Sequence, residues 1–181
     1  INDFYLRGPD SPHPLGQIQS QGRTHGVMAQ TVYPSIPVWA YDWWVARGVD
    51  WLVTSEDLPR PENRVSVEPN GRIRLQYAPN NLGPHEELVR EMRRILRRLG
   101  FWLVVAHSHK GKNTTHQCGT LCFGTDPKAS VLDPYCRTHD VENLFVVDAS
   151  FFPSSAAVNP GLTIIAQALR AADHIAATDF R

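Results

Sequence analysis

A histidine among small and polar neighbours is the first residue in this sequence that could do chemistry. His116 lies in the segment Thr-Thr-His-Gln-Cys-Gly-Thr, residues 114–120. A histidine that titrates near neutral pH can take the proton of a hydroxyl group while an alcohol is oxidised. The alternative is a loop histidine that hydrogen-bonds to backbone, and this residue alone does not decide between the two.

A second chemical feature is the sequence Asn159-Pro160-Gly161, which is typical of a helix start. Asn159 is a good N-cap, and Pro160 suits the first helical position. The free N–H groups and positive dipole end of such a start attract negative charge. The amide of Asn159 could bind a substrate hydroxyl or alkoxide beside His116. Taken singly, an ordinary capped helix is the simpler interpretation.

Two other kinds of site have weaker support in these residues. His116, Cys118 and Cys122 lie close in sequence, but structural zinc normally takes four ligands in paired spacings that are not present. The cysteines are more simply small buried residues. A serine hydrolase could use a serine within residues 150–155, but the sequence has no Gly-x-Ser-x-Gly elbow.

A strand and a helix must position the chemical residues. Leu144 to Val147 is a continuous apolar run, as in a central strand buried on both faces, and it ends at Asp148. The helix that begins at Asn159 is expected to bury a stripe of Leu162, Ile165, Ala168, Leu169, Ala172 and Ile175. Strand, acid and helix start would then converge beyond the carboxyl end of the strand, where ligands of α/β folds bind.

The earlier part of the chain predicts several further elements. Residues 26–33 are the most strand-like piece before residue 40. Apolar and polar residues alternate on either side of the turn Pro69-Asn70-Gly71. This pattern predicts a β-hairpin over residues 54–79, with one face buried and the other exposed to solvent. Apolar residues three and four apart predict a helix over residues 84–99. Phe101 to Ala106 reads as a buried strand.

An aromatic cluster lies between the first strand-like piece and the hairpin. Its members are Trp39, Tyr41, Trp43, Trp44 and Trp51. We interpret them as packing residues, with an aromatic wall for a sugar ring as the alternative.

Length, composition and charge limit the class of protein. The 181 residues could form one domain or two small ones, and 42% hydrophobic with 20% charged residues is typical of soluble globular proteins. The formal net charge is zero, so nothing indicates nucleic acid or an anionic membrane as a partner. The longest apolar run, residues 101–106, is too short to span a bilayer. Three cysteines do not make a disulfide framework, which favours a reducing, cytoplasmic setting, although a leader before Ile1 stays open.

Taken in order, several segments resemble the C-terminal part of the glucose–methanol–choline (GMC) oxidoreductases, which are flavoenzymes. The segments are His116–Thr120, Phe123–Gly124, Ser130–Asp133, Val141–Leu144, Val147–Ser150, Pro153, Asn159–Thr163 and Ala171–Ile175. Order and spacing agree over roughly a third of the chain, which is more specific than any single motif. The form Asn-Pro-x-Leu-Thr is similar to that of pyranose oxidases and other sugar-oxidising members, which favours a sugar or glycoside as substrate.

The resemblance implies a mixed α/β (α+β) fold in two parts. Residues 1–112 would belong to the sheet and helices of the substrate-binding domain, and residues 113–181 would supply the last strand and helix of a Rossmann-like FAD domain. The family opens with a βαβ unit bearing Gly-x-Gly-x-x-Gly, which these residues do not contain. We therefore expect the main FAD-binding portion in a preceding part of the same polypeptide or in a separate chain.

The resemblance also implies roles for individual residues. His116 matches the family's catalytic histidine, which takes the substrate's hydroxyl proton as hydride passes to flavin N5. Asn159 matches the second active-site position, which positions the substrate oxygen. Asp148 and Ala149 match the strand end whose backbone approaches FAD. The turn from Asn159 through Pro160 to Thr163 matches the helix start beside the isoalloxazine ring.

The function implied by the resemblance is FAD-dependent oxidation of an alcohol group, of a sugar or glycoside, by an oxidase or a dehydrogenase. The alternative is a non-catalytic binding fragment, or a degenerate subunit of a flavoprotein complex. The two differ in whether the intact protein binds flavin and loses the flavin's colour with substrate.

Overall fold

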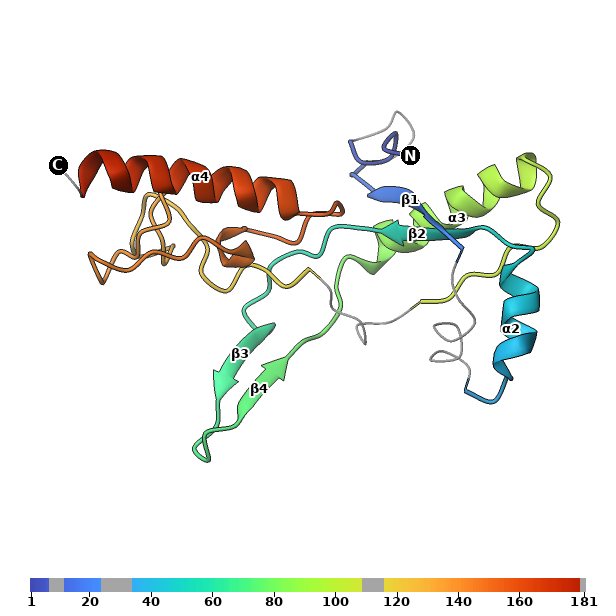
Figure 1. Ribbon diagram of the computed structural model, residues 1–181, viewed down its shortest axis with the longest axis horizontal. Helices are drawn as coiled ribbons and strands as arrows, with labels where there is room; N and C mark the ends of the chain where they lie inside the picture. Colours follow the sequence, from blue (N-terminus) through green and yellow to red (C-terminus); the bar gives the residue numbers. More distant parts are fainter. Residues whose placement is uncertain (7–11, 24–33, 109–115, 180–181) are drawn as a thin grey trace. The chain divides into compact units, whose positions relative to one another are not determined.

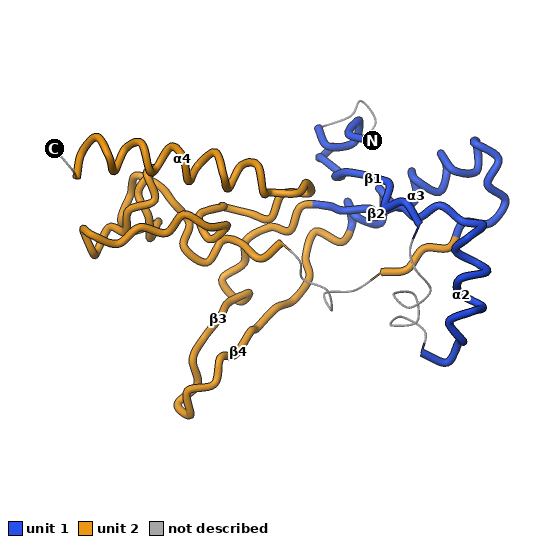
Figure 2. Tube along the Cα trace, in the orientation of Figure 1, with its two compact units in different colours: residues 1–55, 83–104 blue, residues 56–82, 105–181 orange. Residues whose placement is uncertain are grey.

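The computed structural model describes residues 1–6, 12–23, 34–108 and 116–179, which form two compact units (Figure 2). Unit 1 comprises Ile1–Ser55 and Gly83–Val104, and unit 2 comprises Glu56–Leu82 and Val105–Arg181. Each unit therefore takes its residues from two stretches of the sequence. The functional boundary between residues 112 and 113 is a different division and stays a prediction.

The chain contains both helices and antiparallel strands (Figure 1). In chain order they are β1 (Gln17–Gly22), α2 (Val38–Val45), β2 (Asp50–Thr54), β3 (Arg64–Val67), β4 (Ile73–Gln76), α3 (Leu82–Arg98), the 3₁₀ turn η1 (Ala149–Phe151) and α4 (Gly161–Thr178). This content confirms the predicted mixed α/β class.

Unit 1 is built on the antiparallel pair β1–β2, against which α3 packs. Ile18 of β1 lies opposite Val53 of β2, and both contact the apolar face of α3. Leu88, Met92 and Leu96 are the buried residues of α3, and they fall four residues apart as one stripe. The predicted helix is therefore confirmed.

Unit 2 contains the predicted hairpin, but not its predicted buried face. Strands β3 and β4 pair in antiparallel register on either side of Gly71, which has a φ of +80°. The apolar side chains on the hairpin are 51–77% exposed: Val65, Val67, Ile73 and Leu75. The sheet has only these two strands, and no described element of unit 2 covers them. The turn is thus confirmed, and the burial prediction is wrong.

The rest of unit 2 is mostly irregular chain packed against α4. Its core is formed by Leu132, Cys136, Phe151 and Ala171, with Leu121, Val146, Phe152 and Ile164 around them. Near the end of α4, the Arg137 guanidinium binds both carboxylate oxygens of Asp179, at 2.6 and 2.7 Å. Both hydrogen bonds come from one guanidinium nitrogen, Nη2, and they tie the helix end to the loop that carries Cys136.

Two predicted strands do not form in this structure. Residues 101–106 are irregular, and Trp102 is 90% exposed. Residues 144–147 contribute one bridge, between Phe145 and Arg137, and Leu144 and Val147 are exposed. A strand needs a neighbour to take its backbone hydrogen bonds. Within the described ranges no strand lies beside residues 101–106. Residues 144–146 pair with residues 136–138 through two backbone hydrogen bonds, both of 2.9 Å, and this pairing extends no further than the one bridge.

The start of α4 differs from the prediction by one residue. Pro160 occupies the N-cap position, and the helix runs from Gly161. The Pro160 carbonyl accepts the N–H of Ile164 at 3.0 Å, which is the first bond of the helix. Asn159 therefore lies outside the helix and does not cap it.

The buried face of α4 also differs from the predicted stripe. Ala171 is buried in the core of unit 2, and Ile164 packs against that core. Leu162, Ile165 and Leu169 are 84%, 58% and 62% exposed. An apolar face of α4 is thus left uncovered within unit 2.

The aromatic cluster does not pack as one group. On α2, Tyr41 is buried, whereas Trp39, Trp43 and Trp44 are exposed, so the packing prediction is wrong for these three tryptophans. Trp51 is half-buried against the core of unit 1.

The strand predicted at residues 26–33 lies outside the described residues. None of the described helices combines the length and apolar character needed to cross a membrane.

Candidate functional site

His116 lies in the wall of a small pocket within unit 2. The pocket is lined by His116, Cys118, Phe152, Ser154, Ser155, Ala156 and Pro160. Its volume is about 10 Å³, which is space for one water molecule at most. The pocket is therefore one wall of a site and does not by itself enclose a substrate or cofactor.

Turn η1 positions the segment that follows His116. The Asp148 carboxylate caps η1 by accepting the Ser150 N–H at 2.8 Å, and hydrogen bonds from the Ser150 side chain and backbone lower the pKa of Asp148. Gly119 N donates to the Ala149 carbonyl at 3.4 Å, and Leu121 N donates to the Ser150 carbonyl at 3.0 Å. Ala149 and Ser150 thus hold the segment after His116 through backbone hydrogen bonds, and Asp148 caps the turn that carries them.

Gly119 and Cys122 allow a close approach between the two walls of the pocket. Gly119 has a φ of +80°, and an added Cβ would lie 3.2 Å from the Phe152 carbonyl oxygen. A side chain at this position would be both strained and crowded. The Cys122 thiol donates to the carbonyls of Gly119 and Phe152, at 3.3 and 3.2 Å.

In the described part of the chain, no three His, Cys, Asp or Glu side chains form a metal-binding group.

The imidazole of His116 is available for chemistry. The residue is half-buried, and its ring has no hydrogen-bond or ion-pair partner among the described residues. Its backbone carbonyl accepts the Ser155 hydroxyl at 3.5 Å. Among the described residues, no backbone group bonds to this ring, and the choice between the two interpretations of His116 stays a prediction.

Of the residues predicted near the helix start, the structure brings Pro160 into the pocket wall. Asn159 and Thr163 are exposed and lie outside the lining. No side chain caps α4, so its first N–H groups are left for water or a ligand. An added Cβ on Gly161 meets no atom within 4 Å, so the space at the helix start is open.

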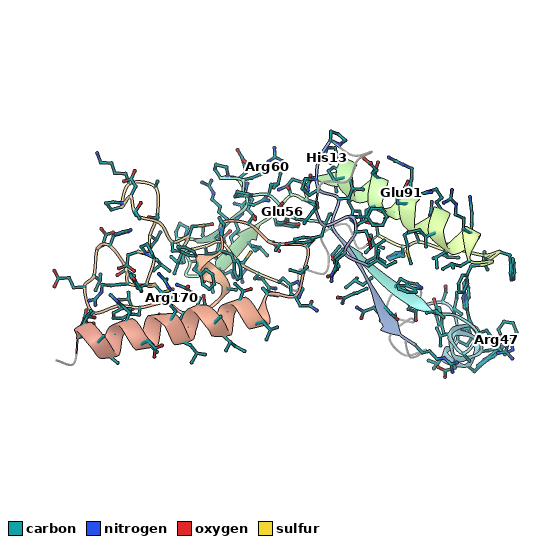
Figure 3. The ribbon with its side chains drawn as sticks, turned by 90° about the horizontal axis from the view of Figure 1, so that it is seen from above. His13, Arg47, Glu56, Arg60, Glu91 and Arg170 are labelled. Atoms are coloured by element: carbon teal, nitrogen blue, oxygen red, sulfur yellow. The ribbon has the colours of Figure 1, made fainter. Side chains whose placement is uncertain are left out.

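Sequence reasoning missed an acidic segment that contacts the pocket loop. Asp57 and Ser155 pair through two backbone hydrogen bonds, of 2.9 and 3.1 Å. The Ser154 hydroxyl donates to Glu56 Oε1 at 2.6 Å. Glu56 is labelled in Figure 3. The interacting residues are about a hundred positions apart, so no local sequence pattern could have shown these contacts.

Asp57 also changes the ionisation of a tyrosine next to it. Tyr77 Oη donates to Asp57 Oδ2 at 2.8 Å. Burial, followed by the hydrogen bond to Asp57 and its charge, raises the pKa of Tyr77 to about 12. Burial likewise raises the pKa of the Cys118 thiol, which keeps it protonated and a poor nucleophile near neutral pH.

The raised pKa of Tyr77 predicts a specific loss of stability in alkali. Between pH 10 and about 12 the unfolded chain loses the phenolic proton while the folded protein keeps it, so the free energy of unfolding should fall as pH rises through this window. Alkaline difference absorbance should show one tyrosine that ionises about two pH units late. Tyr77→Phe should abolish that late component, and a late component that survives the substitution would contradict the assignment.

A larger hollow of about 560 Å³ lies along α3 in unit 1. It is lined by Arg90, Arg93, Arg94, Arg97 and Arg98. Guanidinium groups stay protonated and so cannot serve as base or nucleophile. Arg94 is paired with Glu91 one helical turn away, as on a solvated helix face. We therefore take the smaller pocket around His116 as the candidate active site.

Comparison with known proteins gives the class to which this arrangement belongs. An unpartnered imidazole close to the uncapped start of a long helix is suited to proton transfer beside a bound anion or polar ligand. A family model described as GMC oxidoreductase matches residues 59–168, which include His116, η1 and the first turns of α4. The chain belongs to the GMC oxidoreductase family and corresponds to its C-terminal domain.

Individual relatives agree with this assignment. Paromamine 6'-oxidase from Streptomyces fradiae is 33% identical over 130 residues, which are 66% of this chain and 24% of that protein. The fructose dehydrogenase large subunit of Gluconobacter japonicus is 31% identical over 144 residues, 72% of this chain and 25% of that subunit. 2-Methyl-1,2-propanediol dehydrogenase from Mycolicibacterium austroafricanum is 36% identical over 131 residues, 66% of this chain and 24% of that enzyme. The chain thus spans about a quarter of the length of these relatives.

Proposed function

We propose that this chain is part of an FAD-dependent enzyme that oxidises an alcohol group of a small molecule, such as a sugar or glycoside. The observation that carries the proposal is the imidazole of His116, unpartnered among the described residues and placed in one pocket wall with Pro160 at the start of α4. Fructose and a propanediol, named as substrates of two relatives, both carry hydroxyl groups.

The residues at the start of α4 fit a flavin. An 18-residue helix without a side-chain cap presents free N–H groups and a positive dipole end. The space before Gly161 is open, so a planar ring could approach the backbone there. Pro160 and Thr163 would hold the ring at the helix start, and Asp148 with Ala149 would hold the cofactor at η1. Negative charge on the reduced ring would be stabilised by the helix start.

His116 and Asn159 would have different roles toward the substrate. When bound, FAD supplies the acceptor for the hydride that leaves the carbinol carbon. His116 takes the proton from the substrate hydroxyl, because its ring is open to the pocket and engaged by no described residue. Asn159 is exposed one residue before Pro160, and its side-chain amide would hold the substrate oxygen in place.

The rest of the site must come from another polypeptide portion. The His116 pocket admits one water at most, and apolar faces of β3–β4 and α4 are exposed. We infer that the FAD-binding portion, in the same or a separate chain, covers these faces and completes the cavity. The chain's share of its relatives, about a quarter of their length, agrees with such a portion.

Flavin reduction by an alcohol tests this function directly. The intact protein that contains these residues should be purified yellow, with FAD bound. Anaerobic addition of glucose, a methyl glucoside, fructose or a small diol should bleach the visible absorbance of the flavin with at least one of them. A fully O-methylated glucose, which has the ring but no hydroxyl group, is the matched control. Absence of flavin from the intact protein would contradict the proposal and favour a non-catalytic binding subunit.

A further inference from the structure

The loop between η1 and α4 needs an external support. Residues 152–160 have no helix or strand, yet they supply five of the seven pocket-lining residues. The two serines of this loop, Ser154 and Ser155, line the pocket together with His116. A catalytic wall without secondary structure holds its geometry only if contacts outside the loop fix it.

Glu56 provides one of these contacts. Its carboxylate accepts the Ser154 hydroxyl at 2.6 Å, which is the short distance expected when the acceptor is charged. Glu56 is itself held, because Asn81 Nδ2 donates to its backbone carbonyl at 2.8 Å. Both Glu56 and Ser154 are half-buried, so water competes with this bond less than at an open surface.

The neighbouring residues extend the contact to His116. Asp57 and Ser155 exchange two backbone hydrogen bonds, so residues 56–57 run antiparallel to residues 154–155. Ser155 lies at hydrogen-bond distance from the backbone carbonyl of His116, at 3.5 Å. The acidic segment, the pocket loop and the histidine backbone therefore form one connected set within unit 2.

We propose that Glu56 is a positioning residue of the candidate active site. Its carboxylate binds the Ser154 hydroxyl, and this bond fixes the position of the loop 152–160, which lines the pocket with His116 and leads into α4. The contact itself is independent of the function proposed above, whereas its effect on catalysis rests on that function. Asp57 supports the same loop through backbone alone, so only Glu56 acts through its side chain on Ser154.

A double-mutant cycle in the intact holoenzyme tests this role. Glu56→Ala and Ser154→Ala should each lower the rate constant for anaerobic flavin reduction by about 10- to 100-fold, since small displacements of a positioned group have effects of this size. The double variant should be no slower than either single variant, because each removes the same bond. Glu56→Gln keeps an oxygen acceptor and should recover most of the lost rate. Glu62→Gln, at an exposed glutamate of the same unit, is the matched control and should leave the rate unchanged.

Amide exchange separates this proposal from the proposed function. The Ser155 N–H donates to the Asp57 carbonyl, so its exchange in the resting protein reports on the loop whether or not catalysis occurs. It should accelerate about tenfold in Glu56→Ala and Ser154→Ala, and remain unchanged in Glu62→Gln. Unchanged exchange in the two alanine variants, or rate losses that multiply in the double variant, would overturn the role of Glu56. Accelerated exchange in a protein whose flavin no alcohol reduces would support the Glu56 contact and overturn the proposed function alone.

Discussion

Replacing His116 by alanine in the intact flavoprotein should lower the rate constant for flavin reduction by about 10²- to 10⁴-fold while FAD stays bound. The loss should be confined to chemistry, because the ring is half-buried and no described residue depends on it for a hydrogen bond. Removing it therefore leaves no unsatisfied buried partner, and the free energy of unfolding should change little. Anaerobic stopped-flow absorbance measures the rate, and flavin content per protein measures retention of the cofactor.

A second histidine in unit 2 is the matched control for this experiment. His139 contacts the Ser130 hydroxyl and the Gly124 carbonyl, each at 3.1 Å, and lies outside the pocket lining. His139→Gln removes an imidazole from the same unit and should leave flavin reduction nearly unchanged. If His116→Ala reduced flavin as fast as the unaltered protein, His116 would not be the base.

Truncating Leu132 should produce a large loss of stability in unit 2. The side chain is fully buried and packs with Cys136, Phe151 and Ala171. Leu132→Ala removes apolar contact and leaves a cavity, so the free energy of unfolding should fall by about 2–5 kcal/mol. Chemical denaturation of the intact protein at a fixed FAD concentration measures the change, since bound cofactor adds to apparent stability.

A volume-conserving substitution at the same position separates packing from other effects. Leu132→Met keeps the size and apolar character of the side chain and should cost less than about 1.5 kcal/mol. Equal losses for the alanine and methionine variants would contradict a cavity as the cause. Because Phe151 belongs to η1, the alanine variant should also loosen the turn that supports the His116 segment.

The elements that could be predicted from sequence are those whose signals are local. The turn at Gly71 and the alternation around it are sufficient for β3–β4, and the apolar residues Leu88, Met92 and Leu96 are sufficient for α3. The strands expected at residues 101–106 and 144–147 depend on neighbours elsewhere in space. Apolar composition shows that such a segment needs burial, but not which part of the polypeptide will cover it.

The difference between local signals and distant contacts also explains which face of α4 is buried and which site residues could be predicted. The stripe of large side chains was predicted to face the core, whereas Ile164 and Ala171 do so here, because a helix with several apolar faces has no single period that selects one of them. His116 and Pro160 could be selected from residue type and local context, and the structure brings both to one pocket. The contact of Glu56 with Ser154 could not be predicted, because the two residues are far apart in the sequence and neither belongs to a recognisable motif.

The hairpin β3–β4 has a consequence for handling this polypeptide by itself. Two strands with exposed apolar side chains present free backbone groups along both outer edges. Such edges are templates on which further strands from other copies can add, and this leads to aggregation. Arg64, Arg72 and Arg74 place positive charge among the apolar residues and oppose that process, as gatekeeper residues do. Expressed by itself, this chain is therefore expected to accumulate in inclusion bodies, with the arginines slowing the growth of the aggregates.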